Sequence, residues 1–352
     1  MALIGQYLPN GDSSPYRVGR RLCELSAEAP AQYSYIRFND KGTYLQNASE
    51  VNLFHLTVTP WIGFRPYWNW LFYFRKRRIP IVVNIHGDIR GEFLVSLEDG
   101  FYSLSLMQLP TAIFSKKVLG YANHVIVNSK MMMNLVNEGY GVSKERIHVI
   151  PNGIDIIESL INERPMEQHD DSRPFRIFTH GGLSTRKGLF ELISAIDELN
   201  NRKIKLEMSG NGPLLPLLER MVKERGLQNN ISFLGHISEN DLYSKIREAD
   251  LCIYPSKFDG FNIAALEALA YSSAPVFISN KAGIVEFLPE KITRNCFSPT
   301  KDSISSAIQR AMAISDSDNR ELTALQKETV KTLTWGEVWK RYLRCYDTIL
   351  DG

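Results

Sequence analysis

Short apolar runs in the first half of the chain alternate with segments whose apolar residues have helical spacing. The runs are ALIGQYL, VNLFHLTV, IPIVVNIHG, HVIVNS and IHVIPNG, and helical spacing occurs near residues 15–27 and 64–77. Strands that alternate with helices are typical of βαβ units, which build a parallel sheet. We therefore predict a doubly wound α/β domain over residues 1–158.

The alternation stops in a polar segment, residues 158–174, and then restarts. The later runs are FRIFTHGG, IKLEMSGNGP, NISFLGH, DLCIYPS and APVFIS. A polar segment between two such patterns is typical of a domain boundary, so we predict a linker at 159–171 and a second doubly wound domain at 172–333. Sheets of this kind bind ligands at the carboxyl ends of their strands.

The last segment of the chain, residues 334–352, has the pattern of an amphipathic helix. Thr334 and Glu337 fit a capping box, and large apolar side chains recur every three or four residues from Trp335 to Ile349. One face of this helix must therefore be buried.

Composition narrows the class of protein. Of the 352 residues, 44% are hydrophobic and 23% are charged, and this composition excludes a disordered chain, a collagen and a coiled coil. A chain of this length is too long for one hydrophobic core. A net charge of +2 does not favour a nucleic-acid partner. Four cysteines without a CxxC pair are neither a disulfide framework nor a zinc ribbon. Neither a signal peptide nor a membrane span is evident, so we expect a cytoplasmic protein.

Two carboxylates flank the start of a predicted helix in the segment PSKFDGFNIAALEALA. An apolar strand ends at Pro255, and Asp259 lies in the loop that follows. The helix begins near Asn262 or Ile263 and carries Glu267 about one turn inside. Unpaired N–H groups at a helix N-terminus bind phosphate, and carboxylates beside them accept hydrogen bonds from sugar hydroxyls. The same carboxylates would also offset the helix dipole without a ligand, and the residues alone leave both interpretations open.

A second segment, FTHGGLSTRKGLFELISAI, predicts a strand, a glycine loop and a helix. Gly181 and Gly182 allow a close approach of the backbone, and Arg186 and Lys187 add positive charge at the start of the helix. Such a cluster suits a diphosphate leaving group. The spacing is not that of a Walker A loop, and a solvated cation pair is the alternative.

Three further candidates lie at predicted strand ends. Gly210 in SGNGP predicts either a turn against a nucleotide or a plain helix-entry turn at Pro213. His86 ends a buried strand, where a lone histidine either faces a ligand or is structural. Gly11 precedes the first helix in a candidate anion or sugar loop.

Together these motifs resemble the family 4 retaining glycosyltransferases, whose GT-B fold consists of two facing Rossmann-like domains. The resemblance covers essentially the whole chain and is strongest from His124 to Glu286. HVIVNSKMMMNLVNEGYGVSKERIHVIPNGID is similar to the end of the family's first domain, and GGLSTRKG to its donor-phosphate loop. GNGP followed by ISFLGHIS is similar to its nucleotide-base region, and PSKFDGFNIAALEALA to its E-x7-E segment.

The resemblance implies a role for each matching residue. Lys187 would contact the diphosphate of a UDP- or GDP-sugar, with Arg186 as a second positive charge, and Glu267 would bind the ribose hydroxyls. His86 would face the transferred sugar, and Asp259 would occupy the first acidic position. The positions expected to bind the donor are Gly11, Gly181, Gly182, Gly210, Ile237, Phe261, Asn262, Ile263 and Glu267. Retention implies that the leaving phosphate takes the proton of the acceptor hydroxyl, so that no protein nucleophile is required.

Three residues depart from the family pattern. Asp259 stands where the family usually has Glu, Asn262 adds a side chain at the sugar pocket in place of Gly, and Gly182 stands where many members carry Arg. We interpret these as changes of specificity in an active enzyme. A catalytically silent sugar-nucleotide-binding subunit is the alternative, as is a GT-B epimerase or phosphorylase.

No cofactor or metal is expected beside the nucleotide-sugar. The only D-x-D sequence, Asp316-Ser317-Asp318, lies between helical segments and does not follow a strand. We interpret it as a turn and helix cap.

Aromatic residues run directly into a basic cluster in the segment WIGFRPYWNWLFYFRKRRIP. The cluster is Arg75, Lys76, Arg77 and Arg78, and the aromatic residues before it are Trp61, Trp68, Trp70, Phe72, Tyr73 and Phe74. This composition suits an interface with anionic lipid, and a helix with a buried aromatic face and a solvated basic end is the alternative. Our hypothesis is a peripheral enzyme on the cytoplasmic face of a membrane that glycosylates a glycan or lipid-linked acceptor.

Overall fold

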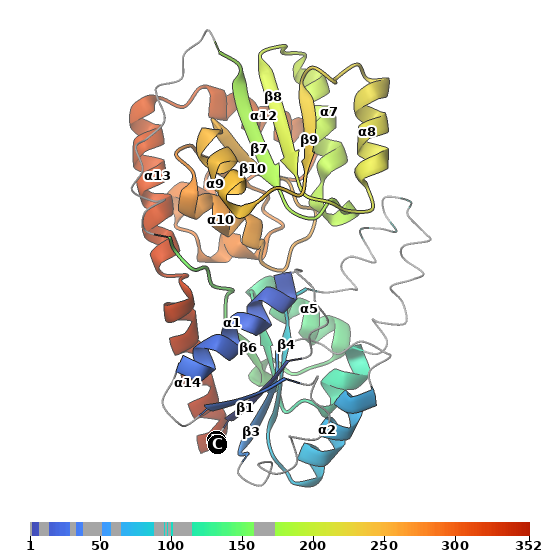
Figure 1. Ribbon diagram of the computed structural model, residues 1–352, viewed down its shortest axis with the longest axis vertical. Coiled ribbons are helices and arrows are strands. Elements are labelled where there is room, and N and C mark those ends of the chain that lie inside the picture. The colour runs from blue at the N-terminus through green and yellow to red at the C-terminus, as the bar shows by residue number, and fades with distance from the viewer. Residues whose placement is uncertain are drawn as a thin grey trace. The chain divides into compact units, whose positions relative to one another are not determined.

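The structure, a computed structural model, describes residues 2–6, 14–28, 33–37, 51–57, 65–87, 95, 97, 100, 115–157 and 173–352. The chain divides into two compact units. The first consists of residues 1–153 together with 333–352, and the second of residues 154–332. Parallel strands flanked by helices build each unit (Figure 1), which confirms the two predicted α/β domains.

The first unit holds a six-stranded parallel sheet in the order β2-β1-β3-β4-β5-β6. The strands β3 and β4 are buried along their whole length, because their runs LFHL and IVVNI lie in the middle of the sheet. The elements are β1 (Ala2–Gln6), α1 (Ser14–Glu28), β2 (Tyr33–Arg37), β3 (Leu53–Leu56), α2 (Arg65–Lys76), β4 (Ile81–Ile85), β5 (His124–Val127), α5 (Lys130–Tyr140), η2 (Lys144–Arg146), β6 (Ile147–Val149) and α14 (Trp335–Asp351).

The second unit holds a five-stranded parallel sheet in the order β11-β10-β7-β8-β9. Its strands are β7 (Phe175–His180), β8 (Ile204–Ser209), β9 (Ile231–Gly235), β10 (Leu251–Tyr254) and β11 (Val276–Ile278). Its helices are η3 (Thr185–Lys187), α7 (Leu189–Leu199), α8 (Leu215–Glu224), α9 (Glu239–Glu248), α10 (Ile263–Tyr271), η4 (Gly283–Phe287), α11 (Glu290–Thr293), α12 (Lys301–Met312) and α13 (Asp316–Lys331).

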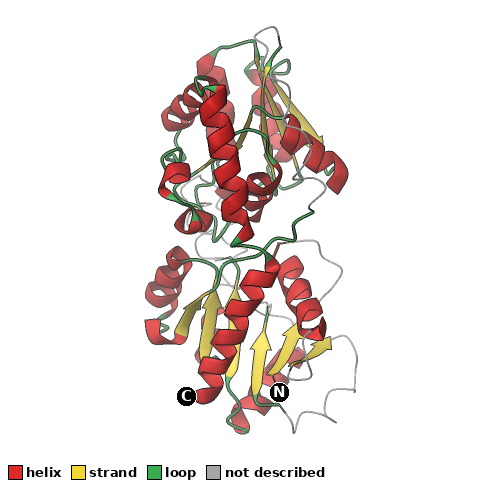
Figure 2. Cartoon of the chain, turned by 90° about the vertical axis from the view of Figure 1, so that its left-hand side faces the viewer, coloured by secondary structure: helices red, strands yellow, loops and turns green. Residues whose placement is uncertain are grey.

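The helix α14 returns to the first unit. Thr334 caps it by accepting a hydrogen bond from the backbone N of Glu337 at 3.4 Å. Its buried face consists of Trp335, Val338, Trp339, Tyr342, Cys345, Tyr346 and Ile349. The helix lies beside the strands of the first unit and ends at the chain terminus (Figure 2).

A buried polar chain fixes α14 on the sheet. The hydroxyl of Tyr346 lies 2.6 Å from Nδ1 of His55, and Nε2 of His55 lies 2.9 Å from Oδ1 of Asn84. The amide of Asn84 in turn donates to the hydroxyl of Tyr342 at 2.8 Å. Tyr346, His55, Asn84 and Tyr342 thus satisfy one another's polar groups. These hydrogen bonds fix the register of α14 against β3 and β4, which burial of an apolar face alone would not do.

The unit boundary lies before the predicted end of the first domain at residue 158. The hydroxyl of Tyr271 in α10 donates to the carbonyl of Asp155 at 3.1 Å and accepts from the backbone N of Ile157 at 3.2 Å. These bonds attach residues 154–157 to the second unit. The predicted linker, 159–171, lies outside the described residues.

Candidate active site

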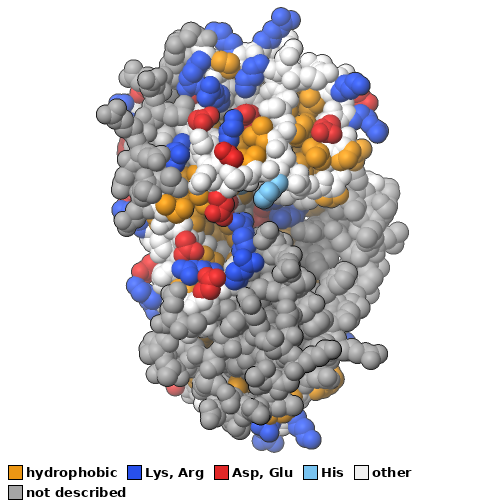
Figure 3. All heavy atoms as spheres, viewed as in Figure 1, with side chains coloured by type: hydrophobic (Ala, Val, Ile, Leu, Met, Phe, Trp, Pro, Cys, Tyr) orange, Lys and Arg blue, Asp and Glu red, His pale blue; other side chains and the backbone are white. Residues whose placement is uncertain are grey.

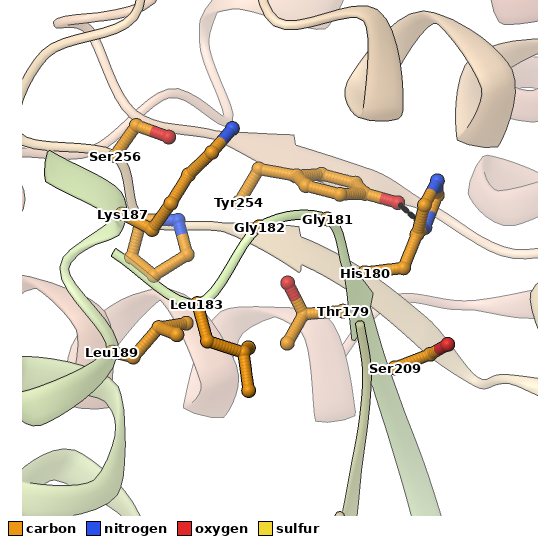
Figure 4. A pocket seen from close by; sticks show the side chains of 11 residues that line it. Thr179, His180, Gly181, Gly182, Leu183, Lys187, Leu189, Ser209, Tyr254 and Ser256 are labelled. Carbon is orange, nitrogen blue, oxygen red and sulfur yellow. Dashed lines mark hydrogen bonds between the residues drawn. The ribbon is translucent and has the colours of Figure 1, made fainter. Parts of the chain in front are cut away.

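A pocket opens at the carboxyl ends of β7, β8 and β10, where a parallel sheet places its ligands. Figure 4 shows the side chains that line it, with the Gly181–Gly182 turn crossing between them. The lining residues are Thr179, His180, Gly181, Gly182, Leu183, Lys187, Leu189, Ser209, Tyr254, Pro255 and Ser256. All of them belong to the second unit.

Glycines let two loops cross at the edge of this pocket. Gly210 has φ +129°, and a Cβ there would lie 1.9 Å from the carbonyl oxygen of Gly181. The backbone N of Gly181 donates to the carbonyl of Ser209 at 2.9 Å, which holds the loops together. Gly210 is therefore required by the packing of the loop itself. Gly182, in contrast, faces open space, since a Cβ there would meet no atom within 4 Å.

The two predicted cations and the first acidic residue meet in one cluster. Oδ2 of Asp259 lies 2.6 Å from Nζ of Lys187 and 2.9 Å from a guanidinium N of Arg186. Burial by itself would raise the pKa of Asp259, but the charges of Lys187 and Arg186 hold that pKa far below its ordinary value. The cluster of two cations and one carboxylate thus carries net positive charge beside the pocket. The carboxylate of Asp259 is engaged with the cations that were predicted to bind the diphosphate.

The start of α10 differs from the sequence expectation in the direction of one side chain. Asn262 has a left-handed backbone (φ +80°), and its Oδ1 accepts from the backbone N of Ala265 at 3.1 Å. Its amide lies 3.3 Å from Oγ of Ser256, and the residue is buried. The side chain of Asn262, which we expect at a sugar pocket, thus caps the helix in this structure.

Phe261 and Ile263 flank this cap. The side chain of Phe261 is buried, with its ring centroid 5.8 Å from that of Phe287, and its backbone N lies 3.3 Å from Oδ1 of Asp259. Ile263 is half-buried at the first position of α10. Only the backbone of Phe261 is therefore placed toward the charged cluster.

Glu267 lies against a residue that the sequence analysis did not select. Its Oε2 lies 3.0 Å from Nε2 of His180, and Nδ1 of His180 lies 2.8 Å from the hydroxyl of Tyr254 (Figure 4 draws the latter bond). His180 is the last residue of β7 and His86 directly follows β4, so the strand-end position that indicates His86 indicates His180 as well.

His86 lies in the first unit, after β4. Its Nε2 donates to the carbonyl of Thr57 at 2.7 Å, and its own carbonyl accepts from the amide of Asn128 at 2.8 Å. Burial lowers the pKa of His86 to about 4, although hydrogen bonds to Thr57 and Asn152 oppose that shift. The imidazole is therefore neutral at pH 7 and carries its proton on Nε2.

The remaining described positions lie on other segments of the chain than the charged cluster, which consists of Lys187, Arg186 and Asp259. Ile237 is half-buried in the loop after β9, and Gly11 lies outside the described residues. Asp316 and Asp318 occupy the first turn of α13, where Oγ of Ser315 accepts from the backbone N of Asp318 at 3.2 Å. Within the described ranges, no three His, Cys, Asp or Glu side chains form a group that could hold a metal ion.

The basic cluster Arg75–Arg78 is exposed at the end of α2, where Figure 3 shows blue side chains at the lower edge of the view. Phe72 is 53% exposed and packs edge-on against Tyr121, and the guanidinium of Arg75 lies 4.8 Å from the centroid of that ring. Phe74 is fully buried and stacks on Phe54, so it does not belong to the predicted aromatic surface. The side chains of Trp61, Trp68 and Trp70 lie outside the description. No helix in the described part of the chain is long and apolar enough to span a bilayer.

Two family models match the chain, one in each half. "Glycosyltransferase Family 4" matches residues 53–158, and "Glycosyl transferases group 1" matches residues 162–326. An uncharacterized glycosyltransferase of Methanocaldococcus jannaschii is 26% identical over 287 residues, which cover 78% of this chain and 70% of that protein.

Two further comparisons bear on fold and chemistry. An N-acetylgalactosamine-N,N'-diacetylbacillosaminyl-diphospho-undecaprenol 4-alpha-N-acetylgalactosaminyltransferase of Campylobacter jejuni is 26% identical over 190 residues, 54% of this chain and 49% of that one. The crystal structure of Anabaena HepE in complex with UDP superimposes with a TM-score of 0.69 at 16% identity and covers all of both chains. The fold is therefore GT-B.

Proposed function

The chain belongs to the family 4 glycosyltransferases, and from this premise we propose that it transfers a sugar from a UDP- or GDP-sugar. The acceptor is a hydroxyl of a glycan or of a lipid-linked acceptor. The transfer retains the configuration at C1 and needs no metal ion. The observation that carries this proposal is the cluster of Lys187, Arg186 and Asp259 beside the glycine loop. A diphosphate is a dianion or trianion, and preorganised cations stabilise the charge that it gains as it leaves. Two side-chain cations supply this stabilisation without help from a metal ion.

In the proposed reaction, the bond between C1 of the sugar and the diphosphate oxygen breaks as the acceptor oxygen bonds to C1 on the same face. The proton of the acceptor hydroxyl goes to the departing phosphate oxygen. Lys187 and Arg186 neutralise the diphosphate, which takes the place of Asp259 as their anionic partner. Glu267 binds the ribose hydroxyls of the nucleotide, and His86, as a neutral imidazole, faces the transferred sugar.

Donor turnover by the purified protein, measured for UDP- and GDP-sugars, tests the proposal. Replacing Lys187 or Glu267 by Ala should lower kcat/KM for the donor by about 10²-fold or more, because each change removes a charged contact. Lys331→Ala, an exposed cation on α13, is the matched control and should leave turnover unchanged. Binding of a nucleotide-sugar without turnover would support the silent subunit instead, and absence of both would contradict the proposal.

We further propose that the enzyme works on a membrane surface through the end of α2. The exposed Phe72 beside four consecutive cations, Arg75–Arg78, supports this proposal, since each cation near an anionic surface contributes about 1 kcal/mol. The basic cluster precedes β4, and His86 follows it. The two therefore lie at opposite ends of a strand that is about 16 Å long. That separation favours a lipid-linked glycan, which projects from the bilayer, over a bare lipid headgroup.

Co-sedimentation with vesicles of mixed anionic and neutral lipid tests this surface. Replacing all four residues of 75–78 by Gln should lower the partition coefficient by about 10³-fold, since about 4 kcal/mol is lost. A variant with four exposed cations of the second unit replaced by Gln, namely Lys291, Arg294, Lys301 and Lys331, has the same net charge and should bind like the wild type. Equal loss in both variants would show that net charge alone, and not the end of α2, attracts the protein.

A further inference from the structure

Three side chains from three elements form a hydrogen-bonded chain that ends on Glu267. Tyr254 comes from β10, His180 from β7 and Glu267 from α10. The two donor–acceptor distances are 2.8 Å between Tyr254 and His180 and 3.0 Å between His180 and Glu267. The side chains of His180 and Glu267 are 6% and 12% exposed, so bulk water competes little for these bonds.

The two hydrogen bonds run in one direction, from Tyr254 through His180 to Glu267. An ionised carboxylate only accepts hydrogen bonds, so Nε2 of His180 carries the proton that it donates to Glu267. Burial raises the pKa of Tyr254 well above its ordinary value, so its hydroxyl keeps its proton and donates to Nδ1 of His180. Tyr254 thereby fixes the tautomer of His180 that donates to the carboxylate.

Packing also holds the imidazole. The ring of His180 stacks at 5.7 Å on that of Phe178, and the ring of Tyr254 meets it edge-on at 5.5 Å. His180 and Tyr254 both line the pocket at the strand ends (Figure 4). An imidazole fixed in this way restricts the torsions of a glutamate that would otherwise sample many rotamers.

We propose that His180 is a positioning residue, which orients the carboxylate of Glu267 for the vicinal hydroxyls of a ribonucleotide, and that Tyr254 sets its tautomer. This inference rests on the proposed function, because it takes Glu267 as the ribose-binding group. It makes His180 responsible for discrimination between a ribose and a deoxyribose. A carboxylate that is held in one orientation accepts hydrogen bonds from both the 2′- and the 3′-hydroxyl of the ribose. A carboxylate that samples several rotamers does not keep both hydrogen bonds at once.

The direct test is the dissociation constant of four nucleotides measured by calorimetry: UDP and GDP, and their 2′-deoxy counterparts. The wild type should bind the better ribonucleotide more tightly than its deoxy form. In His180→Ala this ratio should fall by about tenfold, because the ribonucleotide alone loses affinity. In donor turnover, KM for the donor should rise while kcat changes little.

Three conservative variants separate positioning from a merely structural role. The amide of His180→Gln reaches toward Glu267 as Nε2 does and should restore much of the ratio, whereas the shorter His180→Asn should not. Tyr254→Phe, which keeps the ring, should lower the ratio in the same direction by a smaller factor, and it keeps the proposal testable if His180→Ala does not fold.

The outcomes distinguish this proposal from the one on which it rests. Equal losses of affinity for ribo- and deoxyribonucleotides, or an unchanged ratio in all four variants, would overturn the role of His180 and leave the proposed function standing. A wild type that binds none of the four nucleotides would overturn both.

Discussion

The carboxyl edges of the two sheets have opposite chemical character. At the edge of the second unit lie Lys187, Arg186, Asp259 and Glu267, four charged side chains within one region. At the edge of the first unit His86 is neutral, and its neighbours Thr57 and Asn128 bind it through uncharged groups. Among the described residues, the same topology thus carries charged side chains at the ligand edge of the second unit and a neutral, hydrogen-bonded histidine at that of the first. A diphosphate requires the first kind and a sugar is compatible with the second.

The two units should also respond differently to acid, and this is the largest effect we predict on stability. Burial lowers the pKa of four histidines of the first unit. The pKa is about 4 for His55 and His86, and it is also lowered for His124 and His148. Between pH 6.5 and 4 the unfolded chain therefore binds more protons than the folded one. Stability should fall as the pH drops through this window, by about 3 kcal/mol from His55 alone.

Tryptophan fluorescence can follow this loss, because Trp61, Trp68, Trp70, Trp335 and Trp339 all belong to the first unit. The denaturant midpoint of the fluorescence transition should fall between pH 6.5 and 4 and be flat above that range. The pKa of Asp259 is also lowered, but its contribution is lost only below the ordinary range of carboxyl groups, so the second unit should retain its stability in this window. A fluorescence midpoint that does not change with pH would contradict the assignment.

A smaller effect is expected from removal of the negative charge in the cluster of the second unit. Asp259→Asn leaves Lys187 and Arg186 without their carboxylate and should destabilise the second unit by about 2 kcal/mol, because like charges then face each other. A diphosphate should recover part of that loss. The measurement is the melting temperature with and without UDP or GDP, and the ligand-induced increase should be larger in the variant than in the wild type. An equal increase would show that Asp259 does not compete for these cations.

The smallest effect is expected at Gly182, whereas Gly210 at the edge of the pocket should show a large one. Gly182→Ala should change the free energy of unfolding by less than about 0.5 kcal/mol, because its Cβ would meet open space. Gly210→Ala is the matched comparison and should cost about 3 kcal/mol, since its Cβ would collide with the carbonyl of Gly181. Urea denaturation of the two variants measures this difference, and equal costs would contradict the crossing of the loops.

The alternation of short apolar runs with helical segments was sufficient to predict both parallel sheets, because runs such as IVVNI and LCIY are too short to form helices of ordinary length. It could not place residues 154–157, since tertiary contacts, among them the hydrogen bonds of Tyr271, assign them to the second unit. The orientation of individual side chains could not be predicted from the sequence either. Asn262 occupies the position expected for a sugar contact, yet its carboxamide turns back to cap α10.

The candidate site shows the same limit. Arg186 and Lys187 come from one motif and Asp259 from another. Because 72 positions separate Lys187 from Asp259, their meeting depends on the β7–β10 pairing. The position of His180 at the end of β7 is a signal in the sequence, but it does not by itself separate a structural histidine from a functional one. Its meaning comes from Tyr254 and Glu267, which are distant in sequence.

The claim that the charged edge of the second unit binds the nucleoside diphosphate can be tested most directly by hydrogen–deuterium exchange of the whole protein with and without UDP and GDP. Backbone amides at 181–188 and 259–267 should gain protection with one of the two nucleotides, and the gain should vanish in Lys187→Ala. Protection confined to other segments, or gained equally by Lys187→Ala, would contradict the account.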